Sequence, residues 1–357
     1  MNVLMTGHDG YIGAVMVPVL QAAGHEIVGV DTGFFSGGRP GATGNGFQSI
    51  RHRASGGRFR HLGRDIRDLT AEDFAGIHAV IHLAALSNDP MGELDPELTH
   101  HINHRATLRM ARLAREAGVE RFLQASTCSV YGVADQSELA TEESPLRPYS
   151  AYAVSKVRVE EDLAHLANDG FSPVFMRNAT AYGWSPRFRA DLVLNNLACW
   201  AHTTGEIRIL SDGTPWRPVV HVGDIARAFA AVLAAPRQAI HNQAFNVGVD
   251  EENYQVRDLA AMVQEAFPGC RVTIARDGGP DPRSYRVDFS KIRRKVPGFQ
   301  PAWNARRGAQ ELRSAFEAVG LTREDFTGPR YVRLARLKQL LAQGRLDGQL
   351  RWKTDHP

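Results

Sequence analysis

Tyr152 and Lys156 are four residues apart in a segment with a helical pattern. Positions i and i+4 share one face of a helix, so the phenol and the ammonium can point at the same site. A phenol titrates at about 10, and a positive charge beside it lowers that pKa, which gives a base that works near neutral pH. The chain has five lysines, and Lys156 is the only one before position 291. The pair is therefore a candidate site for proton transfer.

Three glycines, Gly7, Gly10 and Gly13, lie between an expected strand and an expected helix. Glycines in such a turn let the backbone approach a pyrophosphate, and the N-terminus of the helix adds N–H donors and a positive dipole end. Asp31 ends the next expected strand, where a carboxylate accepts hydrogen bonds from an adenosine ribose and repels a 2′-phosphate. We therefore expect NAD rather than NADP as the cofactor. The alternative is a tight turn that binds no ligand.

A regular alternation of elements would position these residues. Short apolar runs predict strands at 3–5, 27–31, 79–83, 121–125 and 174–177. Helical patterns lie between them, at about 14–23, 97–117 and 150–168. Strands that alternate with helices are typical of a parallel sheet with helices on both faces. The predicted fold class is α/β, a Rossmann-type doubly wound parallel sheet with a smaller C-terminal α/β substrate domain.

The chain is expected to divide into three regions. Residues 1–180 would form the NAD-binding domain, and 220–248 would fold back onto it. Residues 181–330 would bind the substrate, because the pattern there loosens into shorter elements. Residues 331–357 are expected to form an amphipathic basic helix.

Two segments lie outside this regular alternation of strands and helices. In the C-terminal one, Tyr331, Leu334 and Leu337 recur at helical spacing among basic residues. We expect this helix to dock on the protein rather than on nucleic acid, because no aromatic platform accompanies its charge. The glycine-rich stretch Gly33–Gly63 has no helical period, and it is expected to be a mobile surface loop or, alternatively, a lid on the active site.

Composition excludes several other function classes. The 42 basic and 39 acidic side chains are nearly balanced, which argues against a nucleic-acid binder. Cys128, Cys199 and Cys270 are odd in number and far apart, so neither a disulfide framework nor a metal site is indicated. No apolar run approaches the roughly 18 residues of a membrane span, and no leader follows Met1. We expect a soluble cytoplasmic protein with no membrane partner.

Several further motifs accompany the glycine turn and the tyrosine–lysine pair. In chain order the set is Thr6-Gly7-x-x-Gly10-x-x-Gly13, Asp31, Asp65-Ile66, His82-Leu83-Ala84-Ala85, Asn103, Thr127-Cys128-Ser129-Val130-Tyr131-Gly132 and Tyr152-x-x-x-Lys156. Together they resemble the extended short-chain dehydrogenase/reductase family, and within it the NAD-dependent nucleotide-sugar epimerases and dehydratases. The likeness is greatest to the UDP-sugar C4 epimerases.

The resemblance implies a role for each matching residue. The catalytic residues would be Thr127, Tyr152 and Lys156. The cofactor would contact Gly7, Gly10, Tyr11, Ile12, Gly13, Asp31, Asp65, Ile66, Leu83, Ala84, Ala85, Asn103 and Lys156. The substrate, a nucleotide-diphosphate sugar, would contact Thr127, Tyr152, Thr180, Asn196, Leu197, Arg217 and Arg283. The resemblance also implies a homodimer that pairs the helices near 97–117 and 150–168.

The segment that follows Thr127 separates the reactions of this family. Its dehydratases need a carboxylate near the transient ketone, and Cys128 and Ser129 occupy those places here. Neither side chain is expected to act as that base, and Cys128 is interpreted as a small packed residue. We therefore expect epimerisation through a 4-keto intermediate, with hydride passing to and from tightly bound NAD. The alternatives are an NAD(P)H-dependent 4-keto-sugar reductase, a dehydratase, and an NAD-binding protein without activity.

Overall fold

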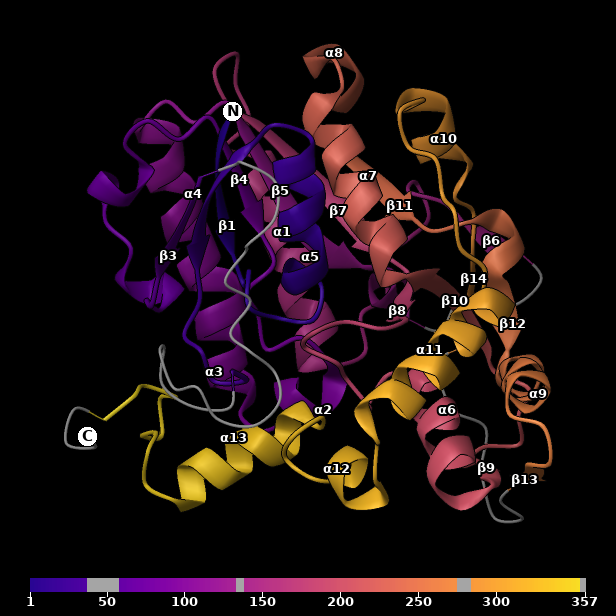
Figure 1. Cartoon of the computed structure of the whole chain (residues 1–357). Helices are drawn as coiled ribbons and strands as arrows, with labels where there is room; N and C mark the ends of the chain where they lie inside the picture. The colour runs from indigo at the N-terminus through magenta and orange to yellow at the C-terminus, as the bar shows by residue number, and fades with distance from the viewer. Residues whose placement is uncertain (37–57, 133–137, 275–283, 354–357) are drawn as a thin grey trace.

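The computed structural model describes residues 1–36, 58–132, 138–274 and 284–353, and a seven-stranded sheet forms its centre (Figure 1). The strand order is β11-β7-β5-β4-β1-β2-β3, and every neighbouring pair is parallel. The strands are β1 (Asn2–Thr6), β2 (Glu26–Val30), β3 (Phe59–Leu62), β4 (Ala79–His82), β5 (Arg121–Thr127), β7 (Ser172–Asn178) and β11 (Gln243–Val247). The order reverses between β1 and β4, which places a crevice at the carboxyl ends of the strands.

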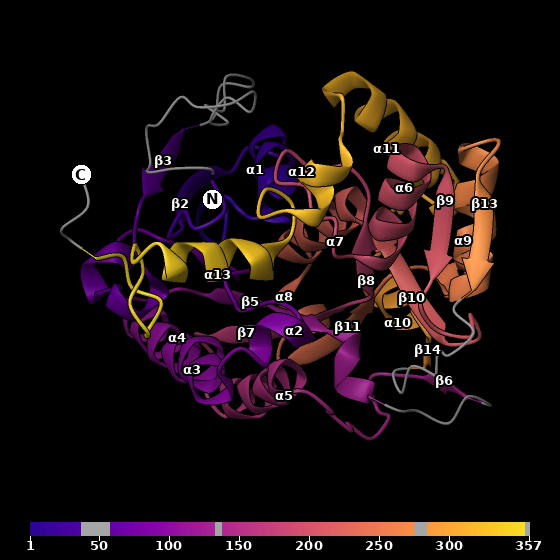
Figure 2. The same ribbon diagram turned by 90° about the horizontal axis from the view of Figure 1, so that it is seen from below.

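Helices cover both faces of this sheet, and the alternation of side chains along β1 shows why. Val3 and Met5 face a core shared with α1 and α7, whereas Leu4 faces a second core shared with α4 and α5. The four helices are α1 (Gly13–Ala22), α4 (Ala106–Glu116), α5 (Ala151–Ala164) and α7 (Val222–Ala234). Figure 2 shows the two helix layers on opposite sides of the strands. The α/β fold class and the Rossmann-type parallel sheet are therefore confirmed.

Smaller sheets and helices form the rest of the molecule. Among the described residues, three small sheets have the orders β12-β10-β8, β13-β9 and β14-β6. Their strands are β6 (Leu139–Ala140), β8 (Thr180–Tyr182), β9 (Glu206–Ile209), β10 (Trp216–His221), β12 (Asn253–Gln255), β13 (Arg271–Ile274) and β14 (Arg286–Val287). The remaining helices are α2 (Asp89–Gly92), α3 (Pro96–His100), α6 (Val193–Thr204), α8 (Arg237–Ile240), α9 (Val256–Ala266), α10 (Ser290–Lys295), α11 (Ala305–Val319), α12 (Arg323–Thr327) and α13 (Arg333–Ala342). None of the helices in the described ranges is both long and apolar enough to span a membrane.

Three predicted elements differ from the structure. The stretch Gly33–Gly63 is not structureless to its end, because Phe59–Leu62 forms the edge strand β3, while residues 37–57 lie outside the described residues. The helix predicted over 97–117 is interrupted by a π-helical turn at His101–Arg105 between α3 and α4. The helix predicted over 331–357 is only ten residues long, and Gly344 with φ +65° then turns the chain back.

Candidate functional site

A cavity of about 880 Å³ lies at the carboxyl ends of the central strands. The loops after β1, β2, β4 and β5 line it, together with the start of α5 and parts of α6, β10 and α13. The predicted site residues among its walls are Gly7, Gly10, Tyr11, Ile12, Gly13, Asp31, Asp65, Ile66, Leu83, Ala84, Ala85, Thr127, Tyr152, Lys156, Thr180, Asn196, Leu197 and Arg217. One cavity therefore brings together residues from both halves of the chain.

The three candidate catalytic residues come from two adjacent elements. Thr127 is the last residue of β5, and Tyr152 and Lys156 lie one turn apart on α5. Ser150 caps this helix by accepting a hydrogen bond from the N–H of Ala153. The Lys156 ammonium donates to the carbonyl of Ala125 at 2.7 Å, and its Nζ lies 5.8 Å from the centre of the Tyr152 ring.

Burial controls the ionisation of these side chains. It raises the pKa of Tyr152 to about 12, an effect that a hydrogen bond with Thr127 offsets only in part. Burial also lowers the pKa of Lys156 to about 8, although the carboxylate of Glu160 opposes the change. In the protein by itself burial therefore outweighs any lowering of the phenol pKa, and the lowering expected from the ammonium together with an oxidised nicotinamide stays a prediction. Both side chains favour their neutral forms more than they would in water.

The backbone of the glycine turn leaves no room for a side chain at Gly7 or Gly13. Gly7 has φ +72°, and a Cβ there would lie 2.8 Å from the backbone nitrogen of Ala84. A Cβ on Gly13 would lie 2.3 Å from the carbonyl oxygen of Gly7. The turn therefore brings bare backbone and the N-terminus of α1 to the wall of the cavity, which is the arrangement that binds a diphosphate.

Asp31 lies directly after β2, beside this turn. Its carboxylate accepts hydrogen bonds from the N–H groups of Gly33 at 2.8 Å and Asp9 at 3.2 Å. Burial raises the pKa of Asp31, and the neighbouring His8 counteracts that change in part. The bare glycine backbone, a fixed carboxylate and a buried ammonium together fit the diphosphate and the two riboses of a dinucleotide.

The opposite wall comes from the second half of the chain. Thr180 lies in β8, Asn196 and Leu197 lie on α6, and Arg217 lies in β10. The Arg217 guanidinium is buried and donates to the carbonyl of Trp216. Arg283, the other predicted phosphate arginine, lies outside the described residues.

Asn103 is a predicted cofactor residue that the structure places elsewhere. Its amide forms two hydrogen bonds with the backbone of Leu86 and one with the hydroxyl of Ser155, and it does not line the cavity. These bonds use the amide to hold the loop after β4 against α5. The structure thus gives Asn103 a positioning role, and its direct contact with the cofactor stays a prediction.

The two residues after Thr127 have different environments. Cys128 is fully buried, and its thiol contacts the carbonyl of Arg177. Burial raises the pKa of this thiol well above its usual value. Ser129 lines the cavity and forms a hydrogen bond with Tyr285. Cys128 is thus a packed residue, and a hydroxyl occupies the cavity at the next position.

Several polar residues that line the cavity belong to no recognised motif, and the sequence did not predict them as site residues. Asp89 raises the pKa of Tyr152 and Arg189 lowers it, so both charges act on the phenol. Arg189 is buried and forms an ion pair with Asp191 at 2.8 Å. Only the position of Asp89, shortly after a central parallel strand, could have indicated a role in the site. No three His, Cys, Asp or Glu residues within the described ranges could together hold a metal ion.

Comparison with known proteins supplies an independent finding. Residues 3–248 match the model of the NAD dependent epimerase/dehydratase family. The chain is 29% identical over 324 residues to UDP-glucose 4-epimerase of Mycolicibacterium smegmatis, with 84% of this chain and 94% of that protein covered. It is 28% identical over 309 residues to dTDP-glucose 4,6-dehydratase of Streptomyces griseus, with 84% and 89% covered.

Solved structures show the same similarity. The structure of MoeE5 with UDP-glucuronic acid and NAD has a TM-score of 0.74 and 27% identity, and the match covers 89% of this chain and all of MoeE5. The dTDP-glucose 4,6-dehydratase DesIV of Streptomyces venezuelae, with NAD bound, has a TM-score of 0.72 and 26% identity, with 90% and 98% covered.

Proposed function

Because the chain belongs to the NAD-dependent epimerase/dehydratase family, we propose that it epimerises a nucleotide-activated sugar through a transient 4-keto intermediate. The observation that supports this reaction is the wall beside Thr127 and Tyr152. Ser129 faces the cavity there and Cys128 faces the core, at the two places where the dehydratases resembled by this sequence have a carboxylate. That wall favours removal of the hydroxyl proton over removal of a carbon-bound proton.

The glycine turn would hold the diphosphate of NAD. Asp31 would bind the adenosine ribose, and Lys156 would bind the nicotinamide ribose. NAD in this site supplies a hydride acceptor and donor. The cofactor would finish each turnover in its starting redox state, because an epimerase returns the hydride that the sugar gives up.

The protein side chains would move the proton. Tyr152, as a phenolate, accepts the proton of the C4 hydroxyl, and the hydroxyl of Thr127 holds the same oxygen. The ammonium of Lys156 stabilises the phenolate, and so does the positive charge that oxidised NAD brings. Asn196 and Arg217 would hold the nucleotide diphosphate while the keto sugar turns its other face.

Product analysis tests the reaction. We expect purified protein given UDP-glucose or UDP-glucuronic acid to form a mixture of the C4 epimers, which proton NMR resolves, with no net change in cofactor redox state. Oxidised cofactor released in proportion to product would instead identify a 4-keto reductase, which would use the same residues. A 4-keto-6-deoxy product that absorbs in alkali would identify a dehydratase.

The dehydratase is the second candidate, and Asp89 is the observation that favours it. This carboxylate lines the cavity and raises the pKa of Tyr152, so a possible base lies within electrostatic reach of the phenol. If a 4-keto-6-deoxy product forms, we expect Asp89→Asn to slow its formation at least 100-fold. If only epimers form, the same substitution should slow turnover less than tenfold.

We also propose that the protein works in the cytoplasm as a homodimer. Cys128, Cys199 and Cys270 are free thiols, which suits a reducing compartment. The dimer would pair α4 and α5 with their copies in a second chain. Sedimentation equilibrium tests this pairing, and a monomer at micromolar concentration would contradict it.

A further inference from the structure

Residues 328–353, which we call the strap, run from the substrate half back across the cofactor half. In Figures 1 and 2, α13 of this strap lies across the end of the central sheet that carries the cavity, and it contacts α2. Leucines of the strap share one apolar cluster with the loops and the short helices α2 and α3 at that end. The buried members of the cluster are Phe34, Leu86, Met91, Leu98, Leu337, Leu340, Leu346 and Leu350.

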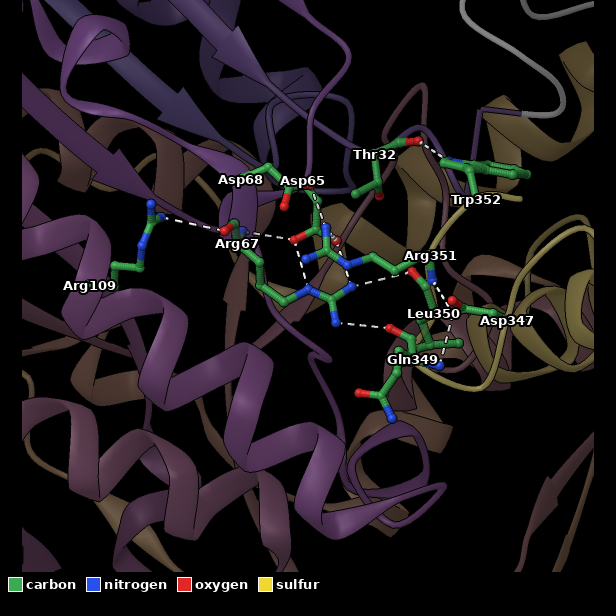
Figure 3. Close-up of polar contacts among 10 residues, drawn as sticks. All are labelled: Thr32, Asp65, Arg67, Asp68, Arg109, Asp347, Gln349, Leu350, Arg351 and Trp352. Carbon is green, nitrogen blue, oxygen red and sulfur yellow. Dashed lines mark hydrogen bonds and ion pairs between the residues drawn. The ribbon is translucent and has the colours of Figure 1, made fainter. Parts of the chain in front are cut away.

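Polar contacts join the end of the strap to the loop after β3 (Figure 3). Arg351 forms ion pairs with Asp68 and, at 3.5 Å, with Asp65. Arg67 donates to the carbonyls of Gln349 at 2.9 Å and Leu350 at 3.4 Å. The strap is therefore fastened to the loop that carries the predicted cofactor residues Asp65 and Ile66.

A further contact joins the strap to the loop after β2. The indole N–H of Trp352 donates to the carbonyl of Thr32 at 2.7 Å, directly after Asp31 (Figure 3). The Trp352 ring also packs against Phe34. Contacts on two loops fix the strap in place, so the residue at the start of α13 has a defined position over the cavity.

That residue is Arg333, and its surroundings are unusual for an arginine. It is 4% exposed and lines the same cavity as Gly7 and Asp31. Its guanidinium donates to the carbonyl of Arg187 at 2.7 Å and lies 4.5 Å from the centre of the Phe35 ring. Within the described part of the chain, no carboxylate forms an ion pair with it.

The acidic residues near Arg333 are engaged elsewhere. Asp9 of the glycine turn pairs with Arg187 at 2.7 Å, and Asp191 pairs with Arg189. Burial and the two neighbouring arginines lower the pKa of Arg333 to about 9, while Asp191 and Asp31 oppose this change. A buried cation without a paired anion is costly, and a bound anion would remove that cost.

We propose that Arg333 is a dinucleotide-binding residue, which the strap holds so that its guanidinium binds the cofactor diphosphate. The carbonyl that holds it belongs to Arg187, whose side chain is bonded to Asp9 in the glycine turn, so Arg333 is tied to the diphosphate loop. A guanidinium matches two phosphate oxygens with two parallel N–H donors. The assignment rests on the proposed function only in requiring that the cavity takes NAD.

Calorimetry on cofactor-stripped protein tests the assignment. We expect Arg333→Met to weaken the binding of NAD at least tenfold, and that of ADP-ribose by the same factor, because both carry the diphosphate. Arg336→Met is the matched control. It lies one turn further along α13, where its guanidinium donates to the carbonyl of Phe34 and to Gln339, and it should change both affinities less than twofold.

Thermal unfolding of the stripped proteins separates binding from a structural role. Arg333→Met should melt at the same temperature as the wild type or higher, because the substitution removes a buried unpaired charge. If Arg333→Met does not fold, Arg333→Lys replaces it, with at least a threefold loss of affinity expected because an ammonium lacks the paired donors.

Three results would overturn the assignment: an unchanged affinity in the variant, a loss for NAD without a loss for ADP-ribose, or a loss of affinity equal to that of Arg336→Met. Wild-type protein that fails to bind NAD would overturn the proposed function together with this assignment. Wild-type protein that binds NAD but does not epimerise a sugar would overturn the reaction alone, and the comparison of variants would still decide the role of Arg333.

Discussion

Burial shifts the pKa values of Tyr152 and Lys156 in opposite directions. Burial raises the pKa of the phenol to about 12 and lowers that of the ammonium to about 8, so the folded protein disfavours the charged form of each. At neutral pH the buried ammonium therefore lowers the stability of the folded protein, whereas the phenol is neutral in both the folded and the unfolded chain and costs nothing. Activity and stability are expected to respond differently when either side chain is replaced.

Lys156→Met should stabilise the stripped protein by about 1–2 kcal/mol at pH 7 and abolish turnover, because it removes a buried cation. In the wild type, the folded-state pKa of about 8 lies below the ordinary 10.5. The penalty for the buried charge is therefore complete below pH 8 and shrinks as pH rises from 8 towards 10.5. Urea unfolding at pH 7 and pH 9.5 measures the difference. Exposed Lys338→Met is the control, and a pH-independent difference would contradict the explanation.

Tyr152→Phe should leave the NAD content of the purified protein unchanged and lower turnover by about 10²–10⁴-fold, because the phenol oxygen is the proton acceptor. Cofactor extraction and NMR product analysis measure the two quantities on one preparation. Turnover within tenfold of the wild type would remove Tyr152 from its proposed role. Exposed Tyr149→Phe is the control.

The sequence predicts relative positions best for side chains that lie on one helix. Tyr152 and Lys156 are one turn apart on α5, so their spacing alone predicted that they share one face, and that face lines the cavity. Arg189 lies in a loop and Asp89 begins the short helix α2, and only the tertiary fold brings them near the phenol. The amide of Asn103 bonds the backbone of Leu86, and no local pattern reveals that contact.

At the scale of elements, the glycine turn joins β1 to α1, and it leaves no room for a side chain at Gly7 or Gly13. Gly13→Ala should destabilise the protein by about 1–3 kcal/mol and weaken NAD binding, because its Cβ would meet backbone atoms of Gly7 and His8 at 2.3 to 2.7 Å. Urea unfolding and calorimetry measure the two effects. Gly298→Ala, where the nearest atom is 3.8 Å away, should change stability by less than about 1 kcal/mol. Equal effects of the two substitutions would refute the steric argument.

The sequence pattern predicted neither the strand β3 nor the π-helical turn at His101–Arg105. The edge strand β3 carries exposed Arg60 and His61, so it lacks the apolar run that marked the central strands. Its pairing with β2 depends on backbone hydrogen bonds, which are independent of side-chain pattern. The π-helical turn at His101–Arg105 was equally hidden, because the apolar positions on either side keep a helical spacing.

At the scale of the whole molecule, the strap links the chain's last described elements to its first loops. The sequence predicted an amphipathic helix that docks on the protein, but its docking place depends on contacts such as Trp352 with Thr32. The match to MoeE5 covers all of that protein but 89% of this chain, so about a tenth of this chain has no counterpart there. Local patterns do not encode such long-range contacts.

Removing the ion pairs at the end of the strap should make α13 more mobile without unfolding the central sheet. Arg351→Met removes the ion pairs with Asp65 and Asp68, which are partly exposed and contribute about 0.2–1 kcal/mol each. Hydrogen exchange of the α13 amides, followed by mass spectrometry, should accelerate about two- to fivefold while exchange in β1 stays unchanged. Lys353→Met, an exposed neighbour, is the control. Acceleration in β1 as well would show that the strap stabilises the whole fold.

Trp352 and Thr32 meet although 320 residues separate them along the chain. During synthesis on the ribosome, the glycine turn and Asp31 therefore emerge long before the strap that crosses them. The parallel sheet can form around an open cleft first, and the strap covers that cleft only once its own residues have been translated. The strap is therefore the last described part of the molecule to be placed, after every strand of the sheet that it crosses has been translated.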